Sequence, residues 1–262
     1  MNLFRTHTGC RLAFTLGSAA AFLPISLSGQ AALSTQAPLP YFNRNVIVLD
    51  PAHGGQDAGG SINGQPEKNI TLGLGTSLRD ALIARGFTVV STRESDLTEA
   101  APVLTTDQRA GIANHLRPAA CVSLHATTRG NGIHISTSSL APSAEPSASI
   151  ATIAWESAQT LYLPQSLRLA NALGAALVRA RLPVLLTRSA LRPLDNFTCP
   201  AIAIEVAPLP SAGAKTVSVT DAGYQRRIVE SLATAILAWR DLNAPRPTAP
   251  APKLIPAPGA TP

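Results

Sequence analysis

The stretch Val46-Ile-Val-Leu-Asp-Pro-Ala-His-Gly-Gly55 decides the fold of this chain. Residues 46–49 form an unbroken apolar run, which predicts a buried strand. Asp50-Pro51 then predicts a turn at the end of that strand. His53 follows the turn, so an ionisable side chain is expected near the carboxyl end of the strand.

The segments that follow alternate between strand and helix patterns. Between Asn69 and Arg85 apolar residues recur every four positions, which predicts a helix with one apolar face. The other predicted helices are Asp107–Leu116 with Thr106 as its N-cap, Ser166–Ala180 and Gly223–Arg240. The other predicted strands are Phe87–Thr92, Cys121–Leu124, Gly132–Thr137 and Ala201–Val206. Such alternation favours an α/β fold with a mainly parallel sheet, in a single domain from about 42 to 243. The Ser-, Ala- and Pro-rich segment 138–165 is expected to be an irregular surface excursion.

The two ends of the chain differ from this domain. Residues 1–32 have the pattern of a signal peptide, with Arg5 and Arg11 before the apolar run Leu12–Leu27. Pro24 interrupts that run, which favours cleavage over an uncleaved anchor and predicts an exported protein, periplasmic or extracellular, without stable membrane insertion. Residues 244–262 are rich in Pro and Ala, which predicts a disordered tail.

The composition limits the possible partners. Of the 262 residues, 45% are hydrophobic and 14% are charged, which suits a chain with a full core. The formal net charge of +6 includes Arg5 and Arg11, so cleavage would leave 6 − 2 = +4. A mild basic excess suits contact with an acidic polymer, although it also serves solubility alone. Because basic runs interleaved with aromatic residues are absent from the sequence, nucleic acid is not an expected partner.

Two cysteines, Cys121 and Cys199, lie outside the predicted signal. Cys121 begins a predicted buried strand and Cys199 lies just before another, and the usual role of such a cysteine is that of a small hydrophobic side chain. We therefore expect two buried free thiols, with a disulfide as the alternative.

Four ionisable residues lie near strand ends or a helix start. His53, His125 and Glu205 follow or end predicted strands, and Glu67 precedes the helix that begins near Asn69. Open parallel sheets place ligand sites at the carboxyl ends of their strands. Two imidazoles and one carboxylate form a common catalytic zinc shell, and a further carboxylate can move the proton of the attacking water. Taken singly, each residue has a structural alternative: a hydrogen-bonded histidine, or a glutamate favoured by a helix dipole.

Six motifs in this order resemble zinc-dependent N-acetylmuramoyl-L-alanine amidases of the amidase 3 family. The resemblance covers about residues 45–240, nearly all of the predicted domain. Its motifs are Asp50-Pro-Ala-His-Gly-Gly-Gln-Asp-Ala-Gly-Gly60, Glu67-Lys-Asn-Ile-Thr-Leu72, Ser91-Thr-Arg-Glu-Ser-Asp96, Arg109 through Ala113-Asn114, Ser123-Leu-His-Ala126 and Pro200-Ala-Ile-Ala-Ile-Glu205.

The resemblance implies a twisted sheet with helices on both faces and a role for each site residue. His53, Glu67 and His125 match the family's ligands to zinc (Zn2+), and Glu205 matches its catalytic glutamate. The implied reaction is hydrolysis, in peptidoglycan, of the amide between N-acetylmuramic acid and L-alanine. The resemblance identifies no activator protein. The positions expected to make scaffold contacts are Arg93, Asp96, Arg109 and Asn114.

Some residues near the implied site differ from the family's usual ones. Ala52 replaces a usual Gly, and Thr127-Thr128 and Val206–Pro210 also differ. The differences near Thr127 and Val206 motivate one alternative, a non-catalytic peptidoglycan-binding protein with the amidase fold. A zinc hydrolase of another amide is the second alternative that the sequence leaves open. His134, on the strand after His125, is expected to pack rather than to face the site.

Overall fold

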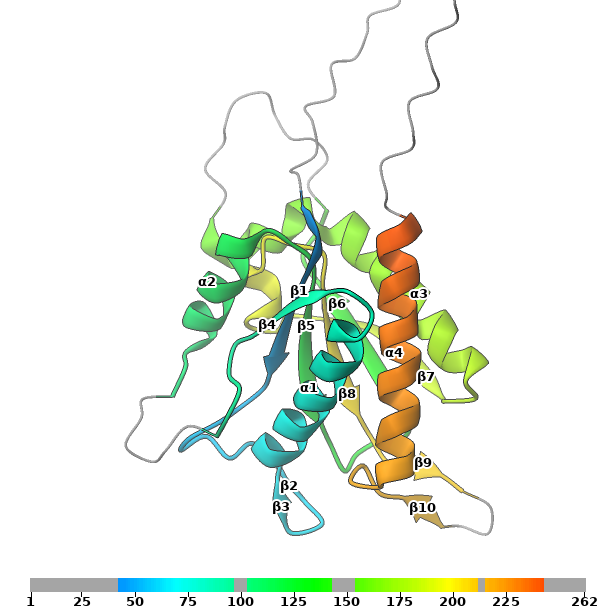
Figure 1. Ribbon diagram of the computed structural model, residues 1–262. Coiled ribbons are helices and arrows are strands. Elements are labelled where there is room, and N and C mark those ends of the chain that lie inside the picture. Colours follow the sequence, from blue (N-terminus) through cyan, green and yellow to red (C-terminus); the bar gives the residue numbers. More distant parts are fainter. Residues whose placement is uncertain (1–41, 97–102, 143–153, 212–214, 243–262) are drawn as a thin grey trace, which may run out of the picture. The chain divides into compact units, whose positions relative to one another are not determined.

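The computed structural model describes residues 42–96, 103–142, 154–211 and 215–242. Its main sheet has six strands in the order β4-β1-β5-β8-β6-β7 (Figure 1). All neighbouring strands are parallel except β6 and β8. These strands are β1 (Asn43–Pro51), β4 (Thr88–Ser91), β5 (Pro118–Ala126), β6 (Ile133–Ser138), β7 (Val184–Ser189) and β8 (Ala201–Val206). The predicted α/β fold with a mainly parallel sheet is therefore confirmed.

Helices cover both faces of the sheet, as expected. On one face pack α1 (Glu67–Ile83), α3 (Leu163–Arg179) and α4 (Ala222–Leu242). On the other face lie α2 (Thr106–Leu116) and the short 3-10 helix η2 (Leu194–Asn196), and a second 3-10 helix, η1 (Trp155–Leu161), packs on η2. Two small hairpins pair β2 (Ser61–Ile62) with β3 (Gln65–Pro66), and β9 (Leu209–Pro210) with β10 (Thr216–Val217).

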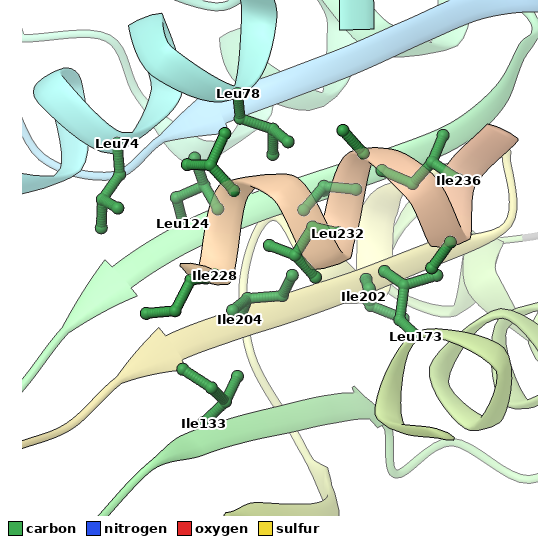
Figure 2. Close-up of a cluster of buried hydrophobic side chains, with 14 of the residues drawn as sticks. Leu74, Leu78, Leu124, Ile133, Leu173, Ile202, Ile204, Ile228, Leu232 and Ile236 are labelled. Carbon is green, nitrogen blue, oxygen red and sulfur yellow. The ribbon is translucent and has the colours of Figure 1, made fainter. Parts of the chain in front are cut away.

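The larger core fills the space between the sheet and the first helical layer. Figure 2 shows Leu74 and Leu78 of α1 and Leu232 of α4 among the isoleucines and leucines of β5, β6 and β8. Because side chains alternate across a strand, Ile202 and Ile204 point into this core. Glu205 is therefore directed to the opposite face, on which α2 and η2 lie.

Cys121 and Cys199 correct one expectation. Both side chains are fully buried, as predicted, but their sulfurs form a disulfide instead of remaining free. Cys121 lies in β5, and Cys199 lies just before β8, which pairs with β5 in parallel register. The bond thus joins the segments that lead to His125 and Glu205.

Several boundaries also differ from the prediction. Helix α2 is capped by Thr105 rather than Thr106, because the Thr105 hydroxyl accepts from the Gln108 amide while the Gln108 side chain accepts from the Thr105 amide. Strand β7 was not predicted. The segment 138–165 is not irregular at its C-terminal end, which contains η1 and the first turn of α3.

The predicted signal peptide, 1–32, and the Pro/Ala-rich tail, 244–262, lie outside the described residues. Within the described ranges, no helix combines the length and apolarity needed to cross a lipid bilayer.

Candidate metal centre

His53, Glu67 and His125 meet at the carboxyl ends of β1 and β5. Each offers a ligand atom within 4.8 Å of the other two. Nε2 of His53 lies 3.2 Å from Oε2 of Glu67, and Nδ1 of His125 lies 3.3 Å from Oε1. The imidazole rings are edge to face, with centroids 5.6 Å apart. The structure thus brings together the three residues that the sequence predicts as a ligand set.

The backbone of His53 is held by a buried ion pair. Nη1 of Arg109 lies 2.8 Å from Oδ1 of Asp50, and both side chains are almost fully buried. Thr92 and Ser123 also donate to the Asp50 carboxylate, at 2.7 and 2.9 Å. From this fixed position Nη2 of Arg109 donates to the carbonyl of His53 at 2.7 Å. The pair therefore fixes the turn that carries the first histidine.

The other predicted scaffold residues support the same region. Arg93 donates to the carbonyls of Pro51, Ala52 and Lys68. Asp96 accepts from Lys68 Nζ at 2.7 Å and from the Gly55 amide at 3.0 Å. These contacts join the end of β1 to the first turn of α1.

Asn114 acts at a greater distance from the cluster. It donates to the Asn196 carbonyl at 3.0 Å and accepts from the Thr198 amide at 2.8 Å. It thereby links α2 to the segment that leads into β8.

Among the non-glycine residues of this turn, His53 has a positive φ, 64°, and Ala52 does not. An alanine at 52 is therefore not strained by a positive φ. Gly59 packs against the ring of His53: a Cβ at this glycine would lie 2.6 Å from Cδ2 of His53, and its φ is +66°. Both features favour glycine at 59, because a side chain there would displace the imidazole.

Glu67, the first residue of α1, is buried and hydrogen-bonded on both carboxylate oxygens. The Gly60 amide donates to Oε2 at 3.0 Å, and the Ala126 amide donates to Oε1 at 3.1 Å. Burial alone would raise the pKa of Glu67, but the hydrogen bonds with His125, His53 and these amides lower it well below its usual range. The carboxylate is therefore charged at neutral pH, as a metal ligand must be.

His53 contacts a second carboxylate through its other nitrogen. Nδ1 lies 2.9 Å from Oδ2 of Asp57, while Nε2 faces Glu67. The hydrogen bond with Glu67, opposed by burial and assisted by Asp57, raises the pKa of His53. A carboxylate on the far nitrogen commonly fixes the orientation of a metal-binding imidazole. Asp57 was not predicted as a site residue, although it lies four residues after His53 in the first motif.

Glu205 lies beside His125 on the neighbouring strand. The two residues are register partners of the parallel pair β5 and β8, so their side chains share a sheet face. The side chain of Glu205 is 44% exposed, and its Oε2 lies 2.9 Å from Nδ1 of His134 in β6. The expectation that His134 only packs is therefore wrong, because β6 runs antiparallel to β8 and pairs His134 with Glu205.

A cavity of about 120 Å3 adjoins the cluster. Among the residues that line it are Asp50, His53, Asp57, Arg109, His125 and Arg192. Both histidines of the cluster line this space, so a small ligand in it could approach them.

The fold and site define a class of protein: an α/β domain with a candidate metal site of two histidines and one glutamate at the carboxyl edge of its mainly parallel sheet. Residues 47–238 match the family model described as N-acetylmuramoyl-L-alanine amidase (Amidase_3). The chain therefore belongs to this amidase family, and the resemblance noted in its motifs is confirmed at that level.

Individual relatives match parts of the chain. It is 38% identical over 91 residues to the germination-specific N-acetylmuramoyl-L-alanine amidase of Bacillus subtilis, covering 30% of this chain and 38% of the relative. It is 33% identical over 148 residues to the N-acetylmuramoyl-L-alanine amidase Rv3717 of Mycobacterium tuberculosis, covering 46% of this chain and 60% of that one. The matches thus span less than two thirds of either relative.

Solved amidase structures share the fold. Ami1 of Mycobacterium smegmatis superimposes with a TM-score of 0.58 at 22% identity, over 75% of this chain and 97% of that one. The catalytic domain of CwlV from Bacillus (Paenibacillus) polymyxa gives a TM-score of 0.56 at 21% identity, over 75% and 98%. At these identities the likeness concerns the fold alone.

Proposed function

We propose that this protein is a zinc-dependent N-acetylmuramoyl-L-alanine amidase acting on peptidoglycan. The observation that carries the proposal is the convergence of His53, Glu67 and His125, with ligand atoms within 4.8 Å, beside Glu205 on the next strand. Membership of the amidase family supports the reaction, and the named relatives are amidases of this specificity.

The donor set fits zinc. Two imidazoles and one carboxylate are a frequent catalytic zinc shell, whereas magnesium and calcium prefer oxygen ligands. Glu67 is 7% exposed, and a buried carboxylate between two histidines is suited to a cation. When bound, zinc supplies a Lewis acid that polarises a carbonyl and makes water nucleophilic near neutral pH.

Glu205 is the residue proposed to move protons. Its partly exposed carboxylate lies beside His125, where it would accept a proton from the attacking water. It would then give that proton to the amide nitrogen as the carbon–nitrogen bond breaks. The products are the lactyl carboxylic acid on the glycan and a peptide with a free L-alanine amino group.

The test compares wild type with Glu205→Gln on purified sacculi, after dialysis against chelator and addition of zinc. We expect wild type to release peptides with amino-terminal L-alanine only when zinc is present. Glu205→Gln should lose roughly 10²–10⁴-fold in rate while retaining bound zinc. Glu94→Gln is the matched control, because Glu94 is an exposed glutamate whose side chain pairs with Arg79 instead.

Two results would contradict the proposal in different ways. Equal binding to sacculi without cleavage, in wild type and Glu205→Gln alike, would favour a peptidoglycan-binding protein. Zinc-dependent release of peptides with another amino terminus would favour a hydrolase of a different amide.

The domain limits and the location are also proposals. We propose that residues 42–243 form the catalytic domain, followed by a Pro/Ala-rich tail. The pattern of residues 1–32 supports export to the periplasm or the cell exterior after signal cleavage. Amino-terminal sequencing of protein recovered from each cell fraction tests this, and a mature chain that retains Met1 in the cytoplasm would contradict it.

A further inference from the structure

Three side chains form a row across neighbouring strands near the metal cluster. His125 of β5 is the register partner of Glu205 of β8, and Glu205 is the partner of His134 of β6. The residues immediately before and after each of these three side chains belong to the larger core. They are Leu124 and Ala126 in β5, Ile204 and Val206 in β8, and Ile133 and Ile135 in β6. The row therefore lies on the opposite face of the sheet from this core.

His134 of β6 and Glu205 of β8, whose side chains contact each other, differ in exposure. The side chain of His134 is 17% exposed and that of Glu205 is 44% exposed. Gly130 packs on the ring of His134, since a Cβ at this glycine would lie 2.7 Å from Cε1. The packed imidazole of His134 therefore restrains the Glu205 carboxylate. Without this contact the Glu205 side chain would occupy several rotamers in solvent.

The direction of the hydrogen bond follows from the chemistry of the groups. An ionised carboxylate only accepts hydrogen bonds, so Nδ1 of His134 carries the hydrogen and donates it to Oε2 of Glu205 over 2.9 Å. Within the described ranges, Oε1 of Glu205 accepts no hydrogen bond from protein. One oxygen is therefore anchored and the other is left for a substrate or water.

We propose that His134 is a positioning residue for the general base Glu205. The inference rests on the proposed amidase function and adds a second residue to its proton-transfer step. Oε1 takes the proton from water and returns it to the leaving nitrogen, while His134 keeps its own proton throughout and restricts the carboxylate to one rotamer. Placement of a catalytic group within about 1 Å is worth on the order of 10²-fold in rate.

A purely structural role for this contact is the competing explanation. Strands β6 and β8 are already paired through four backbone register positions, from Ile133 with Val206 to Ser136 with Ala203. The two strands therefore stay paired without the side-chain bond. The inference predicts a loss of turnover with little loss of stability, and a structural role predicts the reverse.

The first experiment measures kcat and KM of the zinc-loaded full protein with a soluble muropeptide. We expect His134→Ala to lower kcat by about 10- to 100-fold with little change in KM or bound zinc. His134→Asn should restore much of this loss, because its amide nitrogen can take the place of Nδ1, whereas His134→Gln places its amide farther along the side chain and should not. His115→Ala is the matched control, because His115 is an exposed histidine of α2 whose Nδ1 contacts the carbonyl of Gly111.

The second experiment needs no turnover. Nitrogen-15 NMR of the histidine rings should find hydrogen on Nδ1 of His134 in wild type and a changed signal in Glu205→Ala. The signals of His115 should be the same in both proteins.

The outcomes separate this inference from the proposed function. If wild type releases no L-alanine-terminated peptide with zinc restored, the amidase function fails whatever the state of His134. If wild type is active and Glu205→Gln is not, but His134→Ala keeps kcat within twofold of wild type, only the inference is overturned. Equal activity of the Asn and Gln variants, or an Nδ1 without hydrogen, would also overturn it.

Discussion

Replacement of Gly59 by alanine should weaken metal binding through a single methyl group. The added Cβ would lie 2.6 Å from Cδ2 of His53 and 2.9 Å from Cβ of Glu67. Carbon atoms pack at about 3.5 Å or more, so the imidazole must move by roughly 1 Å. Ligand distances in metal sites are defined to about 0.2 Å, and we therefore expect at least a tenfold loss of zinc affinity, or about 1.4 kcal/mol.

Gly64→Ala separates this clash from backbone strain. Gly64 also has a positive φ, +79°, but a Cβ there meets nothing within 4 Å. Gly64→Ala should lose about 1–2 kcal/mol of unfolding free energy in metal-free urea denaturation, because alanine is strained at positive φ, and Gly59→Ala should lose at least as much because the clash adds to the strain. Only Gly59→Ala should bind zinc more weakly in competition with a chromophoric chelator. Equal zinc affinities of the two variants would refute the reasoning.

Three further changes test other parts of the structure. Arg109→Met should lower the unfolding free energy by about 3–5 kcal/mol, because it leaves the buried Asp50 carboxylate without its charged partner. Adding Asp50→Asn should recover part of that loss. A loss under about 1 kcal/mol for Arg109→Met in urea denaturation would contradict this prediction. Burial raises the pKa of Tyr224 to about 12, whereas an unfolded tyrosine titrates near 10. As pH rises, this tyrosine therefore loses its proton first in the unfolded state, which lowers the unfolding free energy. We expect that free energy to fall from pH 10 to 12 in wild type but much less in Tyr224→Phe. Parallel pH profiles of the two proteins would exclude this tyrosine as the cause. Replacing Cys121 and Cys199 by alanine removes a cross-link between residues with a sequence separation of 78. The unfolding free energy, measured by thermal and urea unfolding, should fall by about 4 kcal/mol. An unchanged midpoint would show that the disulfide adds no stability.

The elements that the sequence predicts best are those with strong local patterns. Strand β8 coincides with its predicted range, 201–206, because its apolar run is unbroken up to Glu205. Strand β7 was missed because it is an edge strand in which Leu185 and Leu186 are both exposed. Its apolar residues, 184–186, are consecutive and do not alternate with polar ones, so the sequence pattern of a half-buried strand is missing.

In the site as well, some residues could be predicted from the sequence and others depend on long-range strand pairing. His53, Glu67 and His125 could be grouped from sequence because parallel strands end at a common edge, where ligand sites form. The contact of His134 with Glu205 depends on the antiparallel placement of β6 beside β8, which is a long-range pairing. The disulfide depends on the same kind of information, since Cys121 and Cys199 approach only when β5 and β8 are neighbours.

The strand order has a consequence for how the chain assembles. β8 lies between β5 and β6, although both of these precede it in the chain by more than sixty residues. During synthesis β5 and β6 emerge first, and the position between them is filled only after α3 and β7 have followed. Such late insertion of a central strand raises the contact order and slows folding. Until it occurs, two strand edges stay open to aggregation, and Glu205 has not reached either of its neighbouring histidines.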